Sequence, residues 1–172
     1  MSIQIKGPTS DAIGELRPVR LEDIENGKLL ELLAMSRNHY KGSFLTSSTS
    51  DANTTKKFLE DILKSKSKFI FLIYIYKTSA KDAYVFGHLG YEIIDNYRVE
   101  VTNVMRLPEI DSNVRMLQPL NTLISHLLGA FPESQIFVKV LRSNERAISL
   151  YSLCGFKVSI KESTDKVSVM IL

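Results

Sequence analysis

The sequence predicts a single α+β domain over residues 1–172, with a mixed, mostly antiparallel central sheet flanked by helices. Two observations indicate this class. Short runs rich in aromatic and β-branched residues, such as FIFLIYIY at 69–76, alternate with segments whose apolar residues repeat at helical spacing. An antiparallel meander then leads into a β-α-β-α unit, an order typical of a mixed sheet covered by helices. With 172 residues the chain can form one sizeable core, whereas two domains would each be small.

The N-terminal part is expected to contain a strand at 14–19 and helices at 21–35 and 54–64. Pro18 confines the strand to a sheet edge or an early end, because proline cannot donate to a ladder. Gly27 weakens the first helix. The polar stretch 42–55 is expected to be a surface loop, at the end of which Asp51 or Asn53 caps the second helix.

The remaining elements follow from runs of alternating or continuous apolar residues. They are strands at 68–77, 83–94 and 97–107, a helix at 117–131, a strand at 135–140, a helix at 144–153, and a hairpin of strands at 156–162 and 166–172. Asp95 and Asn96 favour a tight hairpin turn between the second and third of these strands.

Composition and charge exclude several function classes. A net charge of +3, from 22 basic and 19 acidic residues, is too small to favour nucleic acid and suits an anionic small molecule. One cysteine and three dispersed histidines form no metal-ligand pattern, so we expect no metal. The single Cys154 also permits no internal disulfide. No apolar run reaches the roughly 20 residues of a membrane helix, and no targeting segment is evident, so a cytoplasmic protein without a membrane partner is expected.

The stretch LRSNERAISLYSLCGF at 141–156 is the most informative motif. Its residues all have structural explanations: Ser143 or Asn144 caps a helix, an apolar stripe that includes Tyr151 faces inward, and Gly155 ends the helix in a left-handed conformation. Taken together, V-x-x-x-N-x-R-A-I-x-L-Y-x-x-x-G-F at 140–156 resembles the C-terminal motif of the GNAT superfamily of N-acetyltransferases. GHLGYEII at 87–94 and RVEVTNVMRL at 98–107 look like two further strands of that family.

The resemblance implies a GNAT-like fold and direct acetyl transfer from acetyl-CoA to an amine. By resemblance, Tyr151 donates a proton to the departing thiolate, and a backbone N–H near Val104 or Met105 stabilises the oxyanion. Arg106 lies on the same strand, along which the pantetheine arm of coenzyme A would lie, and Asn144 would either bond that arm or serve only as a helix cap.

The general base is left open among three residues. Glu100 stands on the central strand with Thr102 on the same face, and an apolar setting would raise the pKa of its carboxyl. His39, in the segment RNHY, has a suitable intrinsic pKa, and His88 lies on the neighbouring strand. We rank them Glu100, His39 and His88.

The sequence departs from the GNAT pattern in the pyrophosphate loop. Where the family has a glycine-rich turn, this chain has PEIDSNVRMLQPLNTLI at 108–124, which lacks glycine. Glycines in such a turn allow backbone N–H groups at a helix N-terminus to approach the pyrophosphate. Here the binding segment would be Asn113, Val114, Arg115, Met116 and Leu117, with Arg115 offering a charge-assisted contact.

Two functions from different classes are consistent with these patterns. The first is an acetyl-CoA-dependent N-acetyltransferase acting on a small amine, with a nucleotide-linked amino sugar as a candidate acceptor, because RNHYKGSF and NVMR loosely resemble that branch of the family. A peptide or protein amine is the competing acceptor. The second is a non-catalytic GNAT-like domain that binds a ligand or partner through the same cleft. The last strand, 166–172, could pair across a homodimer or be covered within the monomer.

Overall fold

The computed structural model describes residues 1–46, 48–77, 82–108 and 115–172 and confirms the predicted class. In this part of the chain eight strands form one sheet in the order β1-β2-β3-β4-β5-β6-β8-β7. The strands are β1 Ile3–Lys6, β2 Ala12–Pro18, β3 Lys68–Tyr76, β4 Ala83–Asp95, β5 Arg98–Arg106, β6 Gln135–Leu141, β7 Lys157–Ser159 and β8 Val167–Ile171. All neighbouring pairs are antiparallel except β5 and β6, which run parallel.

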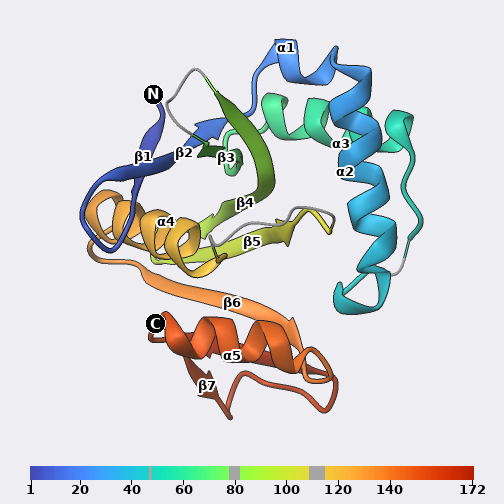
Figure 1. The fold of residues 1–172 in the computed structure, drawn as a ribbon. Coiled ribbons are helices and arrows are strands. Elements are labelled where there is room, and N and C mark those ends of the chain that lie inside the picture. Colours follow the sequence, from blue (N-terminus) through green and yellow to red (C-terminus); the bar gives the residue numbers. More distant parts are fainter. Residues whose placement is uncertain (47, 78–81, 109–114) are drawn as a thin grey trace.

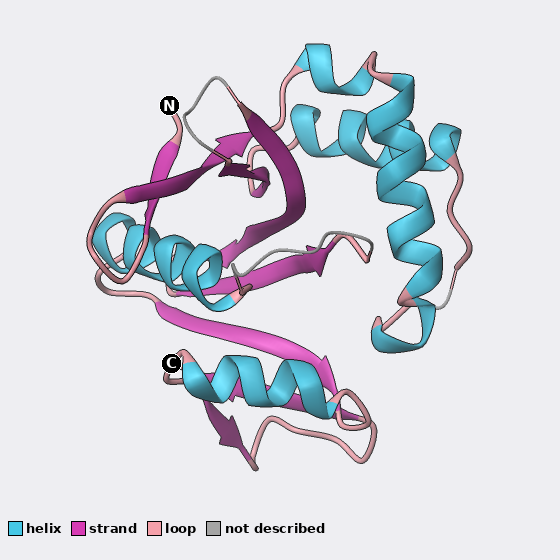
Figure 2. Cartoon of the chain, in the orientation of Figure 1, coloured by secondary structure: helices cyan, strands magenta, loops and turns pink. Residues whose placement is uncertain are grey.

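The helices cover both faces of the sheet (Figures 1 and 2). They are α1 Leu21–Ile24, α2 Gly27–His39, the 3-10 helix η1 Lys41–Ser43, α3 Ala52–Lys64, α4 Leu117–Ala130 and α5 Glu145–Leu153. One apolar cluster packs α4 and α5 against the sheet, and a second packs α2 and α3 against it. No helix in the described ranges is both long and apolar enough to span a bilayer.

The structure differs from the sequence prediction at the N-terminal elements and decides an alternative at the last strand. The single helix expected at 21–35 is divided into α1 and α2, because Asn26 caps α2 by accepting a hydrogen bond from the Leu29 N–H at 3.1 Å. Strand β1 was not predicted, because its sequence, IQIK, contains only two alternating apolar residues and is too short to indicate a strand. For the last strand, two alternatives were open: β8 pairs with β6 on one side and β7 on the other, so it is covered within the monomer.

Strands β5 and β6 diverge after a short parallel contact. Pairing begins at Arg98 with Gln135 and ends at Val101 with Val138, although both strands continue further. Beyond Val101 the edge of β5 therefore has no paired strand on the β6 side among the described residues. The sheet opens at this point, and the opening joins its two helix-covered faces.

A β-bulge interrupts β5 at the same level. Leu89 of β4 lies opposite both Asn103 and Val104, since His88 pairs with Met105 and Gly90 with Thr102. Asn103 has a left-handed φ of 55°. The extra residue reverses which face the side chains occupy: Val99 and Val101 join the α4 cluster, whereas Met105 and Leu107 join the α2–α3 cluster.

Candidate active site

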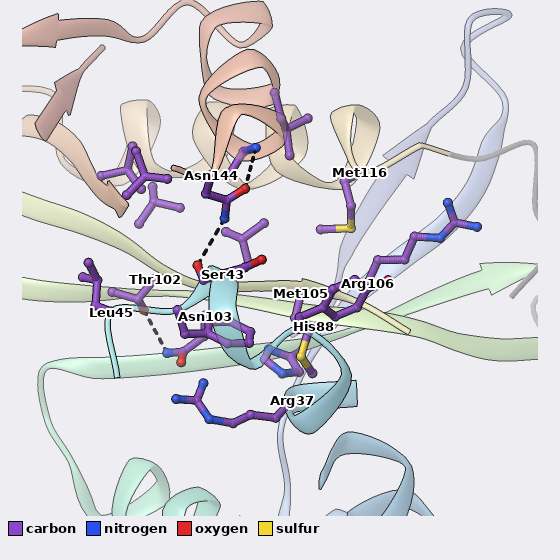
Figure 3. A pocket seen from close by; sticks show the side chains of 18 of the residues that line it. Arg37, Ser43, Leu45, His88, Thr102, Asn103, Met105, Arg106, Met116 and Asn144 are labelled. Carbon is purple, nitrogen blue, oxygen red and sulfur yellow. Dashed lines mark hydrogen bonds between the residues drawn. The ribbon is translucent and has the colours of Figure 1, made fainter. Parts of the chain in front are cut away.

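A cavity of about 1150 Å³ occupies the opening between β5 and β6. Its lining combines residues 100–106 of β5 with side chains from β4, α5, the start of α4 and the α2–α3 segment. Figure 3 shows Asn144, Met116, His88 and Arg37 approaching the cavity from different elements. Most of the residues that the sequence motifs single out are therefore brought to one place.

Tyr151 lies in α5 and lines the cavity. Its side chain is buried and contacts Phe156 edge to face, with ring centroids 5.9 Å apart. Burial raises the pKa of the Tyr151 phenol above its ordinary value, and nearby Cys154 raises it further. The Tyr151 hydroxyl forms no hydrogen bond within the described ranges. The hydroxyl is therefore protonated at neutral pH, and its role as proton donor stays a prediction.

His88 and Glu100 both line the cavity, and their side chains differ in their contacts. The Glu100 carboxylate accepts a hydrogen bond from the Lys139 ammonium at 2.8 Å. The pKa of the His88 imidazole is lowered to about 4: burial is the main cause, the charge of Arg37 also lowers it, and a hydrogen bond with the backbone of Asn103 opposes both effects. The imidazole is therefore neutral at pH 7, and its buried Nδ1 has no hydrogen-bond partner.

The third predicted base, His39, lies elsewhere. It is the last residue of α2, it is exposed, and its ring contacts that of Tyr40 with centroids 4.7 Å apart. His39 is not part of the cavity lining. The structure thus brings Glu100 and His88 together at the cavity and leaves His39 outside it.

The bulge places backbone N–H groups at the cavity. Val104, Met105 and Arg106 all line it, and the Arg106 guanidinium lies 5.2 Å above the Phe86 ring. The Leu107 N–H donates to the Phe86 carbonyl of β4 at 2.9 Å. Because N–H groups alternate sides along a strand, this bond indicates that the Val104 N–H points away from β4, toward the opening. Of the two predicted oxyanion donors, Val104 has the suitable direction.

The predicted pyrophosphate segment is only partly described. Arg115, Met116 and Leu117 line the cavity, whereas Asn113 and Val114 lie outside the described residues. Arg115 is exposed and carries no ion pair within the described ranges. Its guanidinium is thus available at the entrance to α4.

The N-terminus of α4 has the properties of an anion site. Its N-cap, Met116, makes no side-chain capping bond, and no acidic residue stands in the first turn. Pro119 has no N–H, so the first-turn N–H groups without an intrahelical acceptor belong to Leu117 and Gln118. Such groups, together with the helix dipole, favour a bound anion.

Asn144 connects two distant segments of the chain. Its Oδ1 accepts a hydrogen bond from the Ala147 N–H at 3.1 Å, which confirms that it caps α5. Its Nδ2 donates to the Ser43 carbonyl of η1, also at 3.1 Å (Figure 3). To bind a pantetheine amide through Nδ2, Asn144 would have to exchange this bond with Ser43. The cofactor role of Asn144 stays a prediction.

Arg37 is a cavity residue that the sequence reasoning missed. It lies near the end of α2; its Nη2 donates to the Thr46 hydroxyl at 2.7 Å and to the Thr46 carbonyl at 3.3 Å. The guanidinium also lies 4.4 Å above the Phe44 ring. Arg37 belongs to the quoted segment RNHYKGSF, in which a helical arginine has no pattern that separates it from a solvent-exposed one.

A scan against protein-family models gave no match, and a search of curated proteins gave no significant match. Solved structures do match. RimL, a ribosomal alpha-N-protein acetyltransferase in complex with coenzyme A, aligns over 100% of this chain and 97% of its own, with 14% identity and a TM-score of 0.75. FdhC, a nucleotide-linked sugar GNAT, aligns over 100% and 90%, with 14% identity and a TM-score of 0.73. The chain has the GNAT fold.

A third GNAT-fold neighbour acts on a different class of amine. Spermidine N-acetyltransferase from Vibrio cholerae, in complex with coenzyme A and spermine, aligns over 91% of this chain and 93% of its own, with 14% identity and a TM-score of 0.67. Within the described part of this GNAT-fold chain, no group of three or more His, Cys, Asp or Glu side chains is arranged to hold a metal ion. The comparisons therefore establish the fold, and the chemistry depends on the residues of the cavity.

Proposed function

We propose that the protein is an N-acetyltransferase that uses acetyl-CoA as acyl donor and transfers acetyl directly to the amine of a small acceptor. The observation that carries this proposal is the unpartnered Tyr151 hydroxyl in the same cavity as the bulge N–H of Val104. A proton donor and an oxyanion donor at one opening are what transfer from a thioester requires. RimL and the Vibrio cholerae enzyme, both solved with coenzyme A, support the choice of donor.

The residues at the start of α4 fit the pyrophosphate of coenzyme A. The uncapped N–H groups of Leu117 and Gln118 supply hydrogen-bond donors, and Arg115 supplies a positive charge beside them. The absence of an acidic residue in the first turn removes the repulsion that an anion would otherwise meet. Backbone donors thus remain at this helix even though the loop sequence lacks glycine.

The reacting groups have separate roles in the proposal. Acetyl-CoA would supply a thioester, whose carbonyl carbon the amine attacks. The Val104 N–H would bond the carbonyl oxygen as it gains negative charge. Tyr151, which is protonated at neutral pH as any phenol is, would give its proton to the sulfur as the thiolate leaves.

The amine must lose a proton before or during attack. His88 is neutral at pH 7 and lines the cavity, so its imidazole could accept a hydrogen bond from the ammonium group. Glu100 can do the same only while sharing its carboxylate with Lys139. His88 is held in no ion pair among the described residues, so we propose it as the partner of the amine, with Glu100 second.

The finer identity of the acceptor belongs to the proposal as well. A nucleotide-linked amino sugar is supported by the similarity to FdhC, which is a nucleotide-linked sugar GNAT. A peptide amine is the alternative, since RimL shares the fold to a similar degree.

A cytoplasmic location is also part of the proposal. The chain has a single cysteine and therefore no internal disulfide, as is usual for proteins of a reducing compartment.

Calorimetric titration with acetyl-CoA tests the proposal. We expect a micromolar Kd, about −8 kcal/mol, for the unmodified protein. Arg115→Glu should weaken it at least about tenfold, because it replaces a charge-assisted contact by repulsion. Lys57→Glu makes the same charge change on an exposed position of α3 outside the cavity and should leave Kd nearly unchanged. No binding at millimolar acetyl-CoA would refute the acetyltransferase and leave a GNAT fold used for binding another ligand.

A further inference from the structure

The α2–α3 side of the cavity holds a positive charge for which the described residues provide no counter-ion. Arg37 lines the cavity, and none of the ion pairs within the described ranges includes it. Its contacts are Nη2 with Thr46 and the guanidinium face with Phe44. Nη1 and Nε donate to no described residue, so a large part of the planar donor fork is unused.

Such an arrangement is unfavourable in the free protein. Arg37 is partly buried, and this burial lowers the pKa of its guanidinium. A guanidinium removed from water is stabilised best by a carboxylate or phosphate, which meets its fork with two parallel hydrogen bonds. Thr46 and Phe44 offer only neutral partners. An incoming anion would supply the missing contact.

The charged residues that line the cavity also favour an anionic ligand. Glu100 is the one acidic side chain among its described lining residues, and the Lys139 ammonium already pairs with it. The basic lining residues are Arg37, Arg106, Arg115, Lys139 and Arg146. Of these, Arg37 comes from α2, on the opposite face of the sheet from α4, where Arg115 adjoins the proposed pyrophosphate site. Arg37 is thus placed to meet the acceptor rather than coenzyme A.

Arg37 also lies close to the proposed proton acceptor. Its positive charge contributes to the lowered pKa of His88, so the guanidinium and imidazole are near enough to interact. Figure 3 shows both side chains below the bulge of β5. One small molecule could therefore place its amine at His88 and an anionic group at Arg37. Hydroxyl side chains in the same lining, Ser48, Thr49, Ser50, Thr54 and Thr55, supply neutral hydrogen-bond partners for the rest of such a molecule.

We infer that the acceptor is an amine that also carries an anionic group, a phosphate or a carboxylate, and that Arg37 binds this group. The inference rests on the proposed acetyltransferase function and narrows its substrate class. It excludes polyamines such as spermidine, whose additional positive charges would be repelled by Arg37.

A matched pair of amines tests the inference. Glucosamine and glucosamine 6-phosphate differ by one phosphate, and coenzyme A release is measured with each at saturating acetyl-CoA. We expect kcat/KM about ten- to hundredfold higher for the phosphorylated sugar, the range of one or two charge-assisted hydrogen bonds. Arg37→Gln should remove this preference through KM, and Arg37→Lys should retain part of it. Lys41→Gln removes a nearby exposed charge outside the cavity and should preserve the preference. Equal rates with both sugars, or equal losses with both in Arg37→Gln, would overturn the inference.

A binding measurement separates this inference from the proposed function. In isotope-labelled protein the Arg37 Nε–Hε resonance is assigned by its loss in Arg37→Gln. It is then followed during titration with inorganic pyrophosphate, with and without saturating coenzyme A. A saturable shift at millimolar pyrophosphate supports an anion site at Arg37 even if no sugar is acetylated. No shift under either condition overturns it. If coenzyme A itself fails to bind, the proposed function fails, and the titration without coenzyme A still decides whether Arg37 binds an anion.

Discussion

Gly87 of β4 lies directly opposite Arg106 of β5, next to the bulge. A Cβ added at Gly87 would overlap the Met105 carbonyl oxygen and lie 3.0 Å from the Arg106 Cα. Both are backbone atoms, so no side-chain rotation relieves the overlap. Carbon atoms in contact are about 3.5–4.0 Å apart, so Gly87→Ala must push β5 away by roughly 0.5–1 Å.

The size of the effect follows from this displacement. Overpacking of this kind costs about 1–3 kcal/mol. For a chain of this length each kcal/mol lowers Tm by about 2–4 °C, so Gly87→Ala should lower Tm by roughly 2–12 °C. The same movement shifts the Val104 N–H relative to the cavity, and a misplacement of about 1 Å can reduce turnover by about a hundredfold. Stability and turnover should therefore fall together.

Gly129 provides the matched control. It lies in α4, and a Cβ added there has no atom within 4 Å. Gly129→Ala should raise stability by up to about 1 kcal/mol, since glycine weakens a helix interior. Scanning calorimetry and acetyl-transfer kinetics on both variants give changes of opposite sign in Tm and a loss of turnover only for Gly87→Ala. If Gly87→Ala melts within about 1 °C of the parent and keeps its turnover, the contact with β5 does not position the bulge.

Three further predictions concern titratable groups. Tyr151→Phe should leave the acetyl-CoA Kd unchanged by calorimetry while kcat falls at least about a hundredfold; an unchanged kcat excludes Tyr151 as proton donor. Because the pKa of His88 is lowered to about 4, the unfolded chain takes up the proton first, so stability should fall as pH drops from about 6.5 to 4. In His88→Gln the free energy of unfolding, measured in urea, should no longer show this fall, which amounts to at most about 3 kcal/mol. Parallel pH curves for the two proteins would contradict the assignment. Burial raises the pKa of Cys154 to about 11, so alkylation by iodoacetamide at pH 8 should be roughly a hundredfold slower than for glutathione, and equal rates would show an ordinary thiol.

The parts of the fold that were predicted well depend on local chemistry. Helix α5 begins after Asn144 and ends before Gly155, whose φ of 97° is the left-handed conformation expected for a residue that follows a helix. Asp51 caps α3 by accepting a hydrogen bond from the Thr54 N–H at 2.7 Å, one of the two predicted alternatives. In these cases a side chain bonds backbone groups within three residues, so a short stretch of sequence contains the whole interaction.

The features that escaped prediction depend on partners far along the chain. The bulge at Asn103 exists only in the register between β4 and β5, and neither strand alone reveals an extra residue. Alternation along 98–107 gives the correct face for Glu100 but the wrong one beyond the bulge. Arg37 reaches the cavity because α2 packs on the sheet, and its distance from His88 in the sequence hides their proximity in the fold.

The arrangement of charge explains why the opening between β5 and β6 suits a reaction between two ligands. Coenzyme A would enter along the face covered by α4, where Arg115 and uncapped N–H groups would hold an anion. The acceptor would enter along the face covered by α2, where Arg37 would hold a second anion. The two anionic molecules would then be anchored at separate positive sites on opposite faces, which keeps their like charges apart. Their reacting ends, the thioester and the amine, could meet at the opening, where Tyr151 and Val104 line the cavity.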